Sequence, residues 1–197
     1  DCVSDAGMPA ISDPGADLVA KAIDADLEVV PLPGPNAALT ALIASNLDTK
    51  QFTFVGFLPK RGKHRNEVLQ LMAKQTGTLL FYEAPHRLEE VLFDMYKVFG
   101  NRPITIAREL TKKFQTFMRS DLASICKDVT QITYKGEFVL VVGGVETGTN
   151  TEVVTDEPIS YEEEVTKLIA GGMAKKEAIR EVAKRFGVSR RDVYNLV

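Results

Sequence analysis

Short apolar runs alternate with amphipathic stretches along most of the chain, and their lengths and periods separate strands from helices. Short runs rich in apolar and β-branched residues predict strands, whereas apolar positions repeating every three or four residues predict helices. The predicted strands cover residues 27–32, 52–57, 78–83, 103–109, 115–119 and 137–142. The predicted helices cover residues 36–46, 63–74 and 87–99, the last ending at Gly100. This alternation predicts an α/β fold with a largely buried sheet.

A break in composition follows the last of these strands. Residues 146–157 hold hydroxyls, glycine and acidic side chains with little to bury, which indicates a linker. Helical periodicity then returns over residues 161–170, 175–186 and 189–197. The sequence therefore predicts a small helical module behind the α/β part.

The spacing of small and apolar residues in this module fits a helix-turn-helix. Ala183 would allow two helices to cross closely, Gly187 would supply the turn, and Val193 would anchor the second helix. Ser189 is a suitable N-cap for that second helix. Many helical hairpins share this spacing, so contact with nucleic acid and plain packing both stay open.

Composition narrows the class of protein. The 197 residues are 45% hydrophobic and 26% charged, which excludes a disordered tail, a collagen-like fibre and a small disulfide scaffold. No apolar run approaches the ~20 residues that a membrane-spanning helix needs. Cys2 and Cys126 are far apart and form no CxxC motif, so a reducing cytoplasm is the expected location. Because the chain begins at Asp1 with neither Met nor a signal peptide, we expect its native N-terminus to be missing.

Charge is distributed unevenly, although the net formal charge is only −3. Residues 1–59 are acidic, whereas residues 60–75 carry five basic groups and one acidic group. Residues 165–197 carry eight basic groups and three acidic ones. Two basic segments on an acidic body suit an enzyme that touches a polyanion at chosen places. For either segment alone, a solvated basic face is the alternative.

Three predicted junctions between a strand and a helix contain glycines or prolines together with polar side chains. Residues 3–15, VSDAGMPAISDPG, place glycines and prolines among Ser and Asp and predict a helix start with Asp13 as N-cap. In residues 31–38, PLPGPNAA, prolines fix a turn and Asn36 caps an Ala-rich helix. Residues 82–87, YEAPHR, gather a phenol, a carboxylate, an imidazole and a guanidinium. Each could be an ordinary turn, but at the carboxyl ends of strands they together predict a binding site.

Other sequence features limit the chemistry of that site. The first loop is neither GxGxxG nor a P-loop, so a nucleotide phosphate is not its expected ligand. Residues 107–113, ARELTKK, end a strand with charged side chains, for which a surface ion pair is the alternative to a chemical role. His64 and His86 share no metal-ligand spacing with acidic residues or cysteines, so no metal site is predicted.

Six segments occur in an order that resembles one known family. They read VSDAGMPAISDPG, VVPLPGPNAALTAL, GFLPKRGKHR, LLFYEAPHRL, IARELTKKFQ and GEFVLVVGG. Over residues 3–145 the chain is similar to the ribosomal small-subunit methyltransferase I family, the rRNA-modifying branch of the tetrapyrrole methylase superfamily. A helical module like residues 158–197 is also found in that family. Two departures are Met8, where the family more often has Thr, and the absence of the family's N-terminal Gly/Pro-rich strand and loop.

The resemblance implies a two-domain α/β fold of the tetrapyrrole methylase type, with its N-terminal part missing and a small helix-turn-helix-like module at its C-terminus. Residues 1–47 would be the remainder of the N-terminal domain, and residues 48–145 the second α/β domain, which completes the cofactor cleft. Residues 146–157 would be the linker and residues 158–197 the C-terminal module. A homodimer without metal or membrane attachment is also implied.

The same resemblance implies S-adenosylmethionine as methyl donor and 16S rRNA of the 30S subunit as substrate. The acceptor would be the ribose 2′-hydroxyl of a cytidine in the decoding region. The cofactor would be held by several loops, largely through their backbone. Carried over onto matching positions, these contacts are Ser4, Asp5, Ala6, Pro35, Asn36, Tyr82, Glu83, Leu110, Thr111, Glu137 and Phe138.

Methyl transfer from a sulfonium to a hydroxyl is an in-line displacement that needs alignment and help with the loss of a proton. The groups that the sequence offers near the cleft are Glu83, His86, Arg87, Arg108, Glu109 and Lys112. We expect either Glu83 or Glu109 to accept the proton. We expect Arg87, Arg108 and Lys112 to hold phosphate.

Basic side chains outside the cleft are the candidate rRNA contacts. They are Lys60, Arg61, Lys63, Arg65, Arg190 and Arg191. Two other functions stay open on the sequence. A small-molecule tetrapyrrole (corrin/porphyrin) methylase would share fold and cofactor but leaves the basic segments unexplained. A nucleic-acid-binding module without catalysis would leave the cleft loops without purpose.

Overall fold

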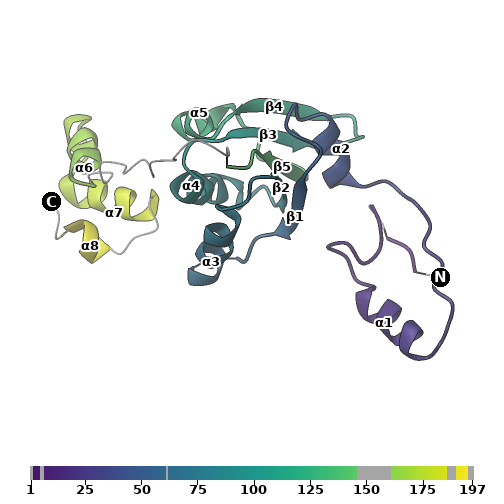
Figure 1. The fold of residues 1–197 in the computed structure, drawn as a ribbon. Coiled ribbons are helices and arrows are strands. Elements are labelled where there is room, and N and C mark those ends of the chain that lie inside the picture. The colour runs from purple at the N-terminus through teal and green to yellow at the C-terminus, as the bar shows by residue number, and fades with distance from the viewer. Residues whose placement is uncertain (1, 5–6, 61, 146–160, 186–189, 195–197) are drawn as a thin grey trace. The chain divides into compact units, whose positions relative to one another are not determined.

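The computed structural model describes residues 2–4, 7–60, 62–145, 161–185 and 190–194 (Figure 1). The chain divides into two compact units, Asp1–Gly148 and Thr149–Val197, and each is described by itself. The helices of the first unit are α1 (Ala16–Asp24), α2 (Ala37–Ile43), α3 (Lys63–Met72), α4 (Leu88–Phe99), α5 (Leu122–Lys127) and the 3-10 helix η1 (Val129–Gln131). Its strands are β1 (Phe52–Phe57), β2 (Thr78–Glu83), β3 (Pro103–Arg108), β4 (Thr116–Asp121) and β5 (Phe138–Val142).

A five-stranded mixed sheet forms the centre of the first unit, in the order β1-β2-β5-β3-β4. β1 runs parallel to β2, whereas β5 is antiparallel to both β2 and β3, and β4 is antiparallel to β3. The carboxyl ends of β1, β2 and β3 therefore meet the amino ends of β5 and β4 at one edge. The register aligns Phe138 with Glu83 on one side and with Arg108 on the other.

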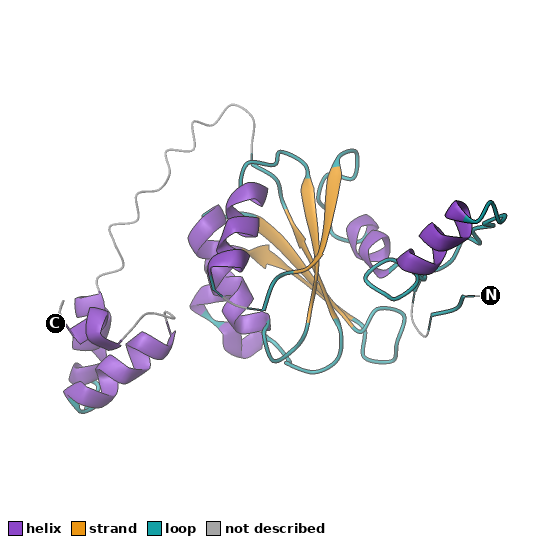
Figure 2. Cartoon of the chain, turned by 90° about the horizontal axis from the view of Figure 1, so that it is seen from below, coloured by secondary structure: helices purple, strands orange, loops and turns teal. Residues whose placement is uncertain are grey.

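The two faces of this sheet are covered unequally. Helices α3, α4 and α5 cover one face, and α2 packs against the other (Figure 2). Alternation along β2 sends Leu79 and Phe81 into the larger cluster and Leu80 into the cluster beneath α2. Burial on both faces explains why the central strands are almost continuously apolar in sequence.

Helix α4 supplies much of the larger core. Its buried residues lie at the spacing of one helical face and are Leu88, Val91, Leu92, Met95 and Phe99. The helix ends at Gly100, whose φ of 68° is in the left-handed region that favours glycine. The helix predicted over residues 87–99 is therefore confirmed, apart from Arg87 at its N-cap.

The N-cap predicted for α2 is also confirmed. The Asn36 side chain accepts a hydrogen bond from the backbone N–H of Leu39 at 3.0 Å. Small residues on the buried face of this short helix, Ala38 and Ala41, let it lie close to the sheet. The segment PLPGPNAA thus ends in a well-formed helix start, as its sequence predicts.

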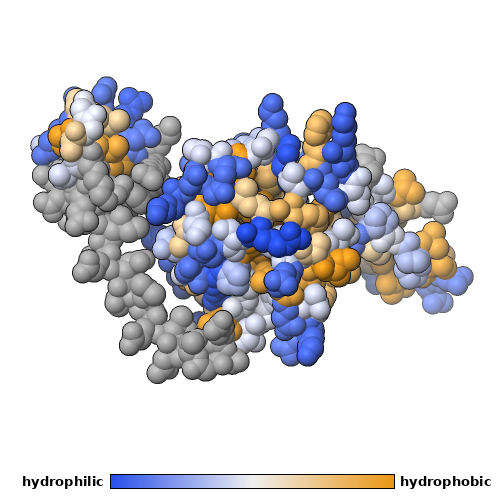
Figure 3. Space-filling model, turned by 90° about the horizontal axis from the view of Figure 1, so that it is seen from above, coloured by the Kyte–Doolittle hydropathy of each residue, from blue (hydrophilic) through white to orange (hydrophobic). Residues whose placement is uncertain are grey.

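The strand predicted over residues 27–32 is wrong. This segment has no regular secondary structure, and none of the described strands pairs with it. Without a neighbouring strand its backbone gains no ladder hydrogen bonds, and Leu27, Val30 and Leu32 remain exposed. Hydrophobic side chains accordingly appear on the surface of the N-terminal segment in Figure 3. An apolar run is therefore not sufficient evidence for a strand.

The predicted cap of the first helix is wrong as well. Helix α1 begins at Ala16 with Gly15 as N-cap, and no side chain of the described residues caps it. Asp13 instead accepts a hydrogen bond from the Ser4 hydroxyl, so its carboxylate is engaged within the loop. The pattern also missed α5 and η1, each of which is capped by an aspartate, Asp121 and Asp128.

The second unit is a small helical cluster built from α6 (Tyr161–Ala170), α7 (Lys175–Arg185) and α8 (Arg190–Tyr194). Its buried side chains include Val165, Ile179, Ala183 and Val193. The packing roles predicted for Ala183 and Val193 agree with their burial, whereas Gly187 and Ser189 lie outside the described residues.

The two cysteines are free thiols in different surroundings. Cys2 is exposed, whereas Cys126 is buried, and burial raises the pKa of its thiol to about 11.

Among the helices of the described segments, none is long and apolar enough to span a membrane.

Replacing Leu92 tests the assigned core. Leu92 is completely buried in the larger cluster, so Leu92→Ala should lower the free energy of unfolding by about 2–5 kcal/mol. Leu71→Ala, at a helical residue that is 62% exposed, should change it by less than about 0.5 kcal/mol. Urea unfolding followed by circular dichroism measures both. Equal losses in the two variants would contradict the assignment.

Candidate active site at one edge of the sheet

Four loops meet at the edge where three strands end and β5 begins. Residues 58–60 follow β1, residues 84–87 follow β2, and residues 109–112 follow β3. Glu137 immediately precedes β5. The pairing of β5 with both β2 and β3 brings the second and third of these loops to either side of Glu137. Of the three junctions predicted to meet at the carboxyl ends of strands, only residues 82–87 lie at the end of a strand. In the part of the chain that the structure describes, no strand precedes residues 3–15 or 31–38, so the prediction is wrong for these two segments.

An ion-pair cluster occupies the β3 side of the edge. The Lys112 ammonium lies 3.2 Å from Glu109 Oε1 and 2.9 Å from Glu137 Oε2. Glu109 Oε1 also accepts a hydrogen bond from the backbone N–H of Glu137 at 2.9 Å. Glu109 and Thr111 have positive φ values of 50° and 63°, so this turn is held in a conformation that such residues rarely adopt.

These contacts favour the charged forms of Glu109 and Lys112. The backbone N–H of Glu137, and then Lys112, lower the pKa of the Glu109 carboxyl. Hydrogen bonds to Glu137 and Glu109 raise the pKa of the Lys112 ammonium. Glu109 thus remains a carboxylate, and 17% of its side-chain surface is exposed.

Gly136 makes this arrangement possible, and the sequence analysis missed it. It has a φ of 86°, and a Cβ at this position would lie 2.5 Å from Glu109 Cγ. Any larger residue would therefore displace the Glu109 side chain. A glycine directly before a buried strand was the available signal, because such a glycine often marks a close approach.

Glu83, at the end of β2, has the opposite electrostatic character. Its side chain is fully buried, with Oε1 accepting from the Ala84 backbone N–H at 2.8 Å and lying 3.3 Å from Arg87 Nε. Its second oxygen, Oε2, is buried and has no hydrogen-bond partner among the described residues. Burial raises the pKa of this carboxyl, although the Ala84 N–H and Arg87 oppose the rise. Of the two candidate proton acceptors, Glu83 is thus buried and Glu109 is partly exposed.

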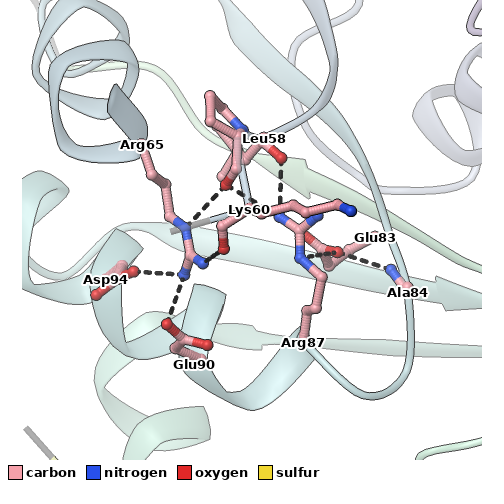
Figure 4. Close-up of polar contacts among 9 residues, drawn as sticks. Leu58, Lys60, Arg65, Glu83, Ala84, Arg87, Glu90 and Asp94 are labelled. Carbon is pink, nitrogen blue, oxygen red and sulfur yellow. Dashed lines mark hydrogen bonds and ion pairs between the residues drawn. The ribbon is translucent and has the colours of Figure 1, made fainter. Parts of the chain in front are cut away.

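Arg87 turns inward from the start of α4. Its Nη2 donates to the carbonyls of Leu58 at 2.8 Å and Pro59 at 3.2 Å, and its Nε faces Glu83 (Figure 4). These contacts engage Nη2 and Nε, and 16% of the Arg87 side chain is exposed, so the phosphate contact predicted for Arg87 stays a prediction. His86, next to it, is exposed.

Arg65 is also a correction to the sequence analysis. Its residue exposure is 1%, and it donates to the carbonyls of Pro59 and Lys60 and pairs with Asp94 and Glu90 (Figure 4). A side chain so enclosed cannot contact RNA directly. The missed partners, Glu90 and Asp94, lie four residues apart on α4 and therefore share one helical face.

The β2 end carries an aromatic group that faces β1. The ring of Tyr82 packs edge-on against Phe54 at 5.1 Å and Phe57 at 5.7 Å between centroids. Burial raises the pKa of the Tyr82 phenol. Leu110 packs against the same cluster as Tyr82, beneath α2. This side of the edge therefore offers apolar surface.

The N-terminal loop forms a separate hollow of about 420 Å³, lined by Cys2, Val3, Ser4, Asp13, Pro14, Gly15 and Leu18. The first and second predicted cofactor loops lie close together, since a Cβ at Gly7 would be 3.7 Å from the Pro35 carbonyl oxygen. Asp5 and Ala6, two of the predicted cofactor contacts, lie outside the described residues.

The remaining predicted RNA contacts and site residues differ in how exposed their side chains are. Lys60, Lys63 and Arg190 are exposed, as an RNA contact must be. Arg108 donates from Nε to the Lys135 carbonyl at 2.6 Å, which occupies one edge of its guanidinium. Arg61 and the side chain of Arg191 lie outside the described residues. Within the described segments, no cluster of three His, Cys, Asp or Glu side chains could hold a metal ion.

Comparison with known proteins shows which family the chain belongs to. The family model of Tetrapyrrole (Corrin/Porphyrin) Methylases matches residues 2–126. The Ribosomal RNA small subunit methyltransferase I of Halalkalibacterium halodurans is 48% identical over 194 residues, covering 98% of this chain and 67% of that protein. The protein of the same name from Bacillus subtilis is 43% identical, covering 98% of this chain and 66% of its own length. The chain thus spans about two thirds of the length of these relatives.

Solved structures agree on the fold. The methyltransferase CobJ has a TM-score of 0.52 at 21% identity, with 71% of this chain and 62% of that chain covered. Uroporphyrin-III C-methyl transferase from Thermus thermophilus, complexed with S-adenyl homocysteine, has a TM-score of 0.52 at 13% identity, with 70% and 62% covered. At such identities the likeness concerns fold alone.

The fold and the matching model define a member of the tetrapyrrole methylase family. Within it, the chain belongs to the ribosomal RNA small subunit methyltransferase I family. Both the fold class and the family implied by the six sequence segments are confirmed.

The burial of Glu83 has a consequence for stability that pH can reveal. Because its pKa is raised in the folded chain, the folded state binds this proton more tightly than the unfolded state does. The resulting stability is present below the unfolded pKa of about 4.3 and is lost as pH rises through the folded pKa. Glu83→Gln removes this loss, so its free energy of unfolding relative to the parent chain should increase between about pH 4 and pH 7.

Urea unfolding at several pH values measures this difference, with Glu28→Gln at an exposed position as the control. A difference between Glu83→Gln and the parent chain that stays constant or shrinks with rising pH would contradict the assigned environment of Glu83.

Proposed function

We propose that this chain is the catalytic part of an S-adenosylmethionine-dependent methyltransferase that acts on 16S rRNA in the 30S subunit. The observation that carries the proposal is the 48% identity to a Ribosomal RNA small subunit methyltransferase I over nearly the whole chain. The acceptor we propose is the ribose 2′-hydroxyl of a cytidine in the decoding region. A homodimer in the cytoplasm is the proposed working form.

The cofactor would bind where the loops after β2 and β3 meet the start of β5. Tyr82 and Leu110 supply apolar surface for an adenosyl group, and the exposed Glu137 carboxylate suits a cationic part of the ligand. The register that pairs Glu83 with Phe138 keeps the proposed contacts 82–83 and 137–138 adjacent. S-adenosylmethionine supplies an electrophilic methyl group on a sulfonium, so the residues themselves need only position the reactants and manage one proton. The T. thermophilus neighbour complexed with S-adenyl homocysteine supports this choice of cofactor.

For the proton acceptor, we propose Glu109 over Glu83. A general base must reach the proton that it removes, and geometry precedes pKa in this choice. Glu109 is partly exposed at the edge, whereas the Glu83 side chain is wholly buried. The Lys112 ammonium beside Glu109 would hold the carboxylate in place.

Amide substitutions separate the two carboxyl groups. Glu109→Gln should lower kcat by about 100-fold or more, the range for loss of a general base, while the Km for S-adenosylmethionine changes little. Glu83→Gln should affect stability and its pH dependence more than kcat. Steady-state kinetics on both variants provides the measurement. A large kcat loss in Glu83→Gln with a near-normal Glu109→Gln would transfer the role to Glu83.

The exposed basic side chains give the proposed rRNA contact its physical basis. Lys60 and Lys63 stand near the site edge, and Lys63 is 91% exposed. Ammonium groups in such positions bind phosphate oxygens and release counterions. Arg190 of the helical unit is a further proposed contact.

The reaction itself can be tested with tritium-labelled S-adenosylmethionine. The native protein that carries this chain is incubated with undermodified 30S subunits, with naked 16S rRNA and with a tetrapyrrole acceptor. We expect label in 2′-O-methylcytidine after digestion of the RNA to nucleosides. Label on the tetrapyrrole alone would replace the proposed substrate with a small molecule. Label in a methylated base would keep the RNA and overturn the 2′-hydroxyl as acceptor.

A further inference from the structure

A buried arginine lies beneath the basic segment that follows β1. All three guanidinium nitrogens of Arg65 have partners in the protein. Nε donates to the Pro59 carbonyl at 3.1 Å, and Nη2 donates to the Lys60 carbonyl. Nη1 lies 2.7 Å from Asp94 Oδ2 and 3.3 Å from Glu90 Oε1. The side chain therefore ties two consecutive carbonyls of one loop to helix α4.

A second arginine holds the same loop from its other end. Arg87 donates to the Leu58 and Pro59 carbonyls, and Glu83 faces its Nε at 3.3 Å. The two guanidiniums thus fix three consecutive carbonyls, as Figure 4 shows. A loop without regular secondary structure gains through them the backbone partners that a strand or helix would otherwise supply.

The held segment leads directly to the exposed cations. Lys60 belongs to it, and Lys63 begins α3 three residues later. The positive charge of Arg65 is itself compensated by Glu90 and Asp94, so it adds little to the field that a phosphate would meet. Arg65 can therefore influence a polyanion only by fixing the positions of neighbouring residues.

We propose that Arg65 is a positioning residue for the RNA substrate: by clamping the carbonyls of residues 59 and 60, it sets where Lys60 and Lys63 meet phosphate. This inference rests on the proposed function, because it assigns a role toward the rRNA of that reaction. It differs from direct phosphate binding, for which the buried side chain is not available. It also differs from general stabilisation, for which the chain contains a matched control.

Arg102 is that control. It is likewise buried, at 7% exposure, and its guanidinium donates to the Ala73 carbonyl at 2.5 Å and lies 4.9 Å from the centre of the Phe99 ring. It tethers backbone between α3 and β2, away from the loop that carries Lys60. If buried arginines act only on stability, substitutions at the two positions should have equivalent effects on RNA binding.

The experiment compares Arg65→Lys with Arg102→Lys in the native protein that carries this chain. Lysine keeps the charge but loses the planar fork that reaches several carbonyls at once. We expect Arg65→Lys to raise the Kd for 16S rRNA and the Km for 30S subunits by about tenfold, as for the loss of a phosphate contact. The Km for S-adenosylmethionine and kcat should stay within about twofold of the parent values. Arg102→Lys should leave all of these within about twofold while lowering the melting temperature.

Two results would overturn the inference. One is an unchanged Kd for RNA in Arg65→Lys, and the other is an equal increase in Arg102→Lys. Should Arg65→Lys not fold, Asp94→Asn loosens the same clamp more gently and should raise the Kd for RNA by about threefold. A normal Kd in that variant would then count against the clamp.

The parent protein separates this inference from the proposed function. Binding of 16S rRNA without methyl transfer would overturn the proposed reaction, and the comparison of Kd values would still test the clamp. Absence of RNA binding by the parent protein would overturn both.

Discussion

The hydrogen bonding of β5 between β2 and β3 is the constraint on which the rest of the first unit depends. Because β5 is antiparallel to both neighbours, its first residue, Phe138, aligns with the last residues of both. The loops after β2 and β3, far apart in sequence, therefore lie on either side of the start of β5. A slip of one residue would exchange the faces of the strand and separate the charged groups at this edge.

Much of this arrangement could be predicted from sequence, because it depends on local periodicity. The strands over residues 78–83 and 137–142 and the helix ending at Gly100 are recognisable from their own residues. The strand predicted over residues 27–32 is wrong because an apolar run contains no information about whether a partner strand lies beside it. Pairing is a property of distant residues, and a single sequence reveals it only through resemblance to a family.

In the candidate site, too, local sequence predicts some features, whereas others depend on contacts between distant residues. Residue types at the end of the strand over residues 103–109 predicted charged groups there, Glu109 and Lys112 among them, but not their contacts with Glu137, which depend on the pairing of β5 with β3. Sequence alone gave no sign that Arg65 points inward, since a basic helix in a basic segment suggests a solvated face. The partners that reverse that expectation, Glu90 and Asp94, belong to a helix that is distant in the chain.

The two free thiols give this chain an internal reporter of opening motions. The thiol of Cys126 is buried beneath α4, with its Sγ 3.5 Å from the Leu92 carbonyl oxygen, whereas Cys2 is exposed. A thiol reagent would modify Cys2 at the rate set by its own chemistry, but it would reach Cys126 only when α5 separates from α4. The ratio of the two rates would give the free energy of that separation, without any label having to be engineered into the chain.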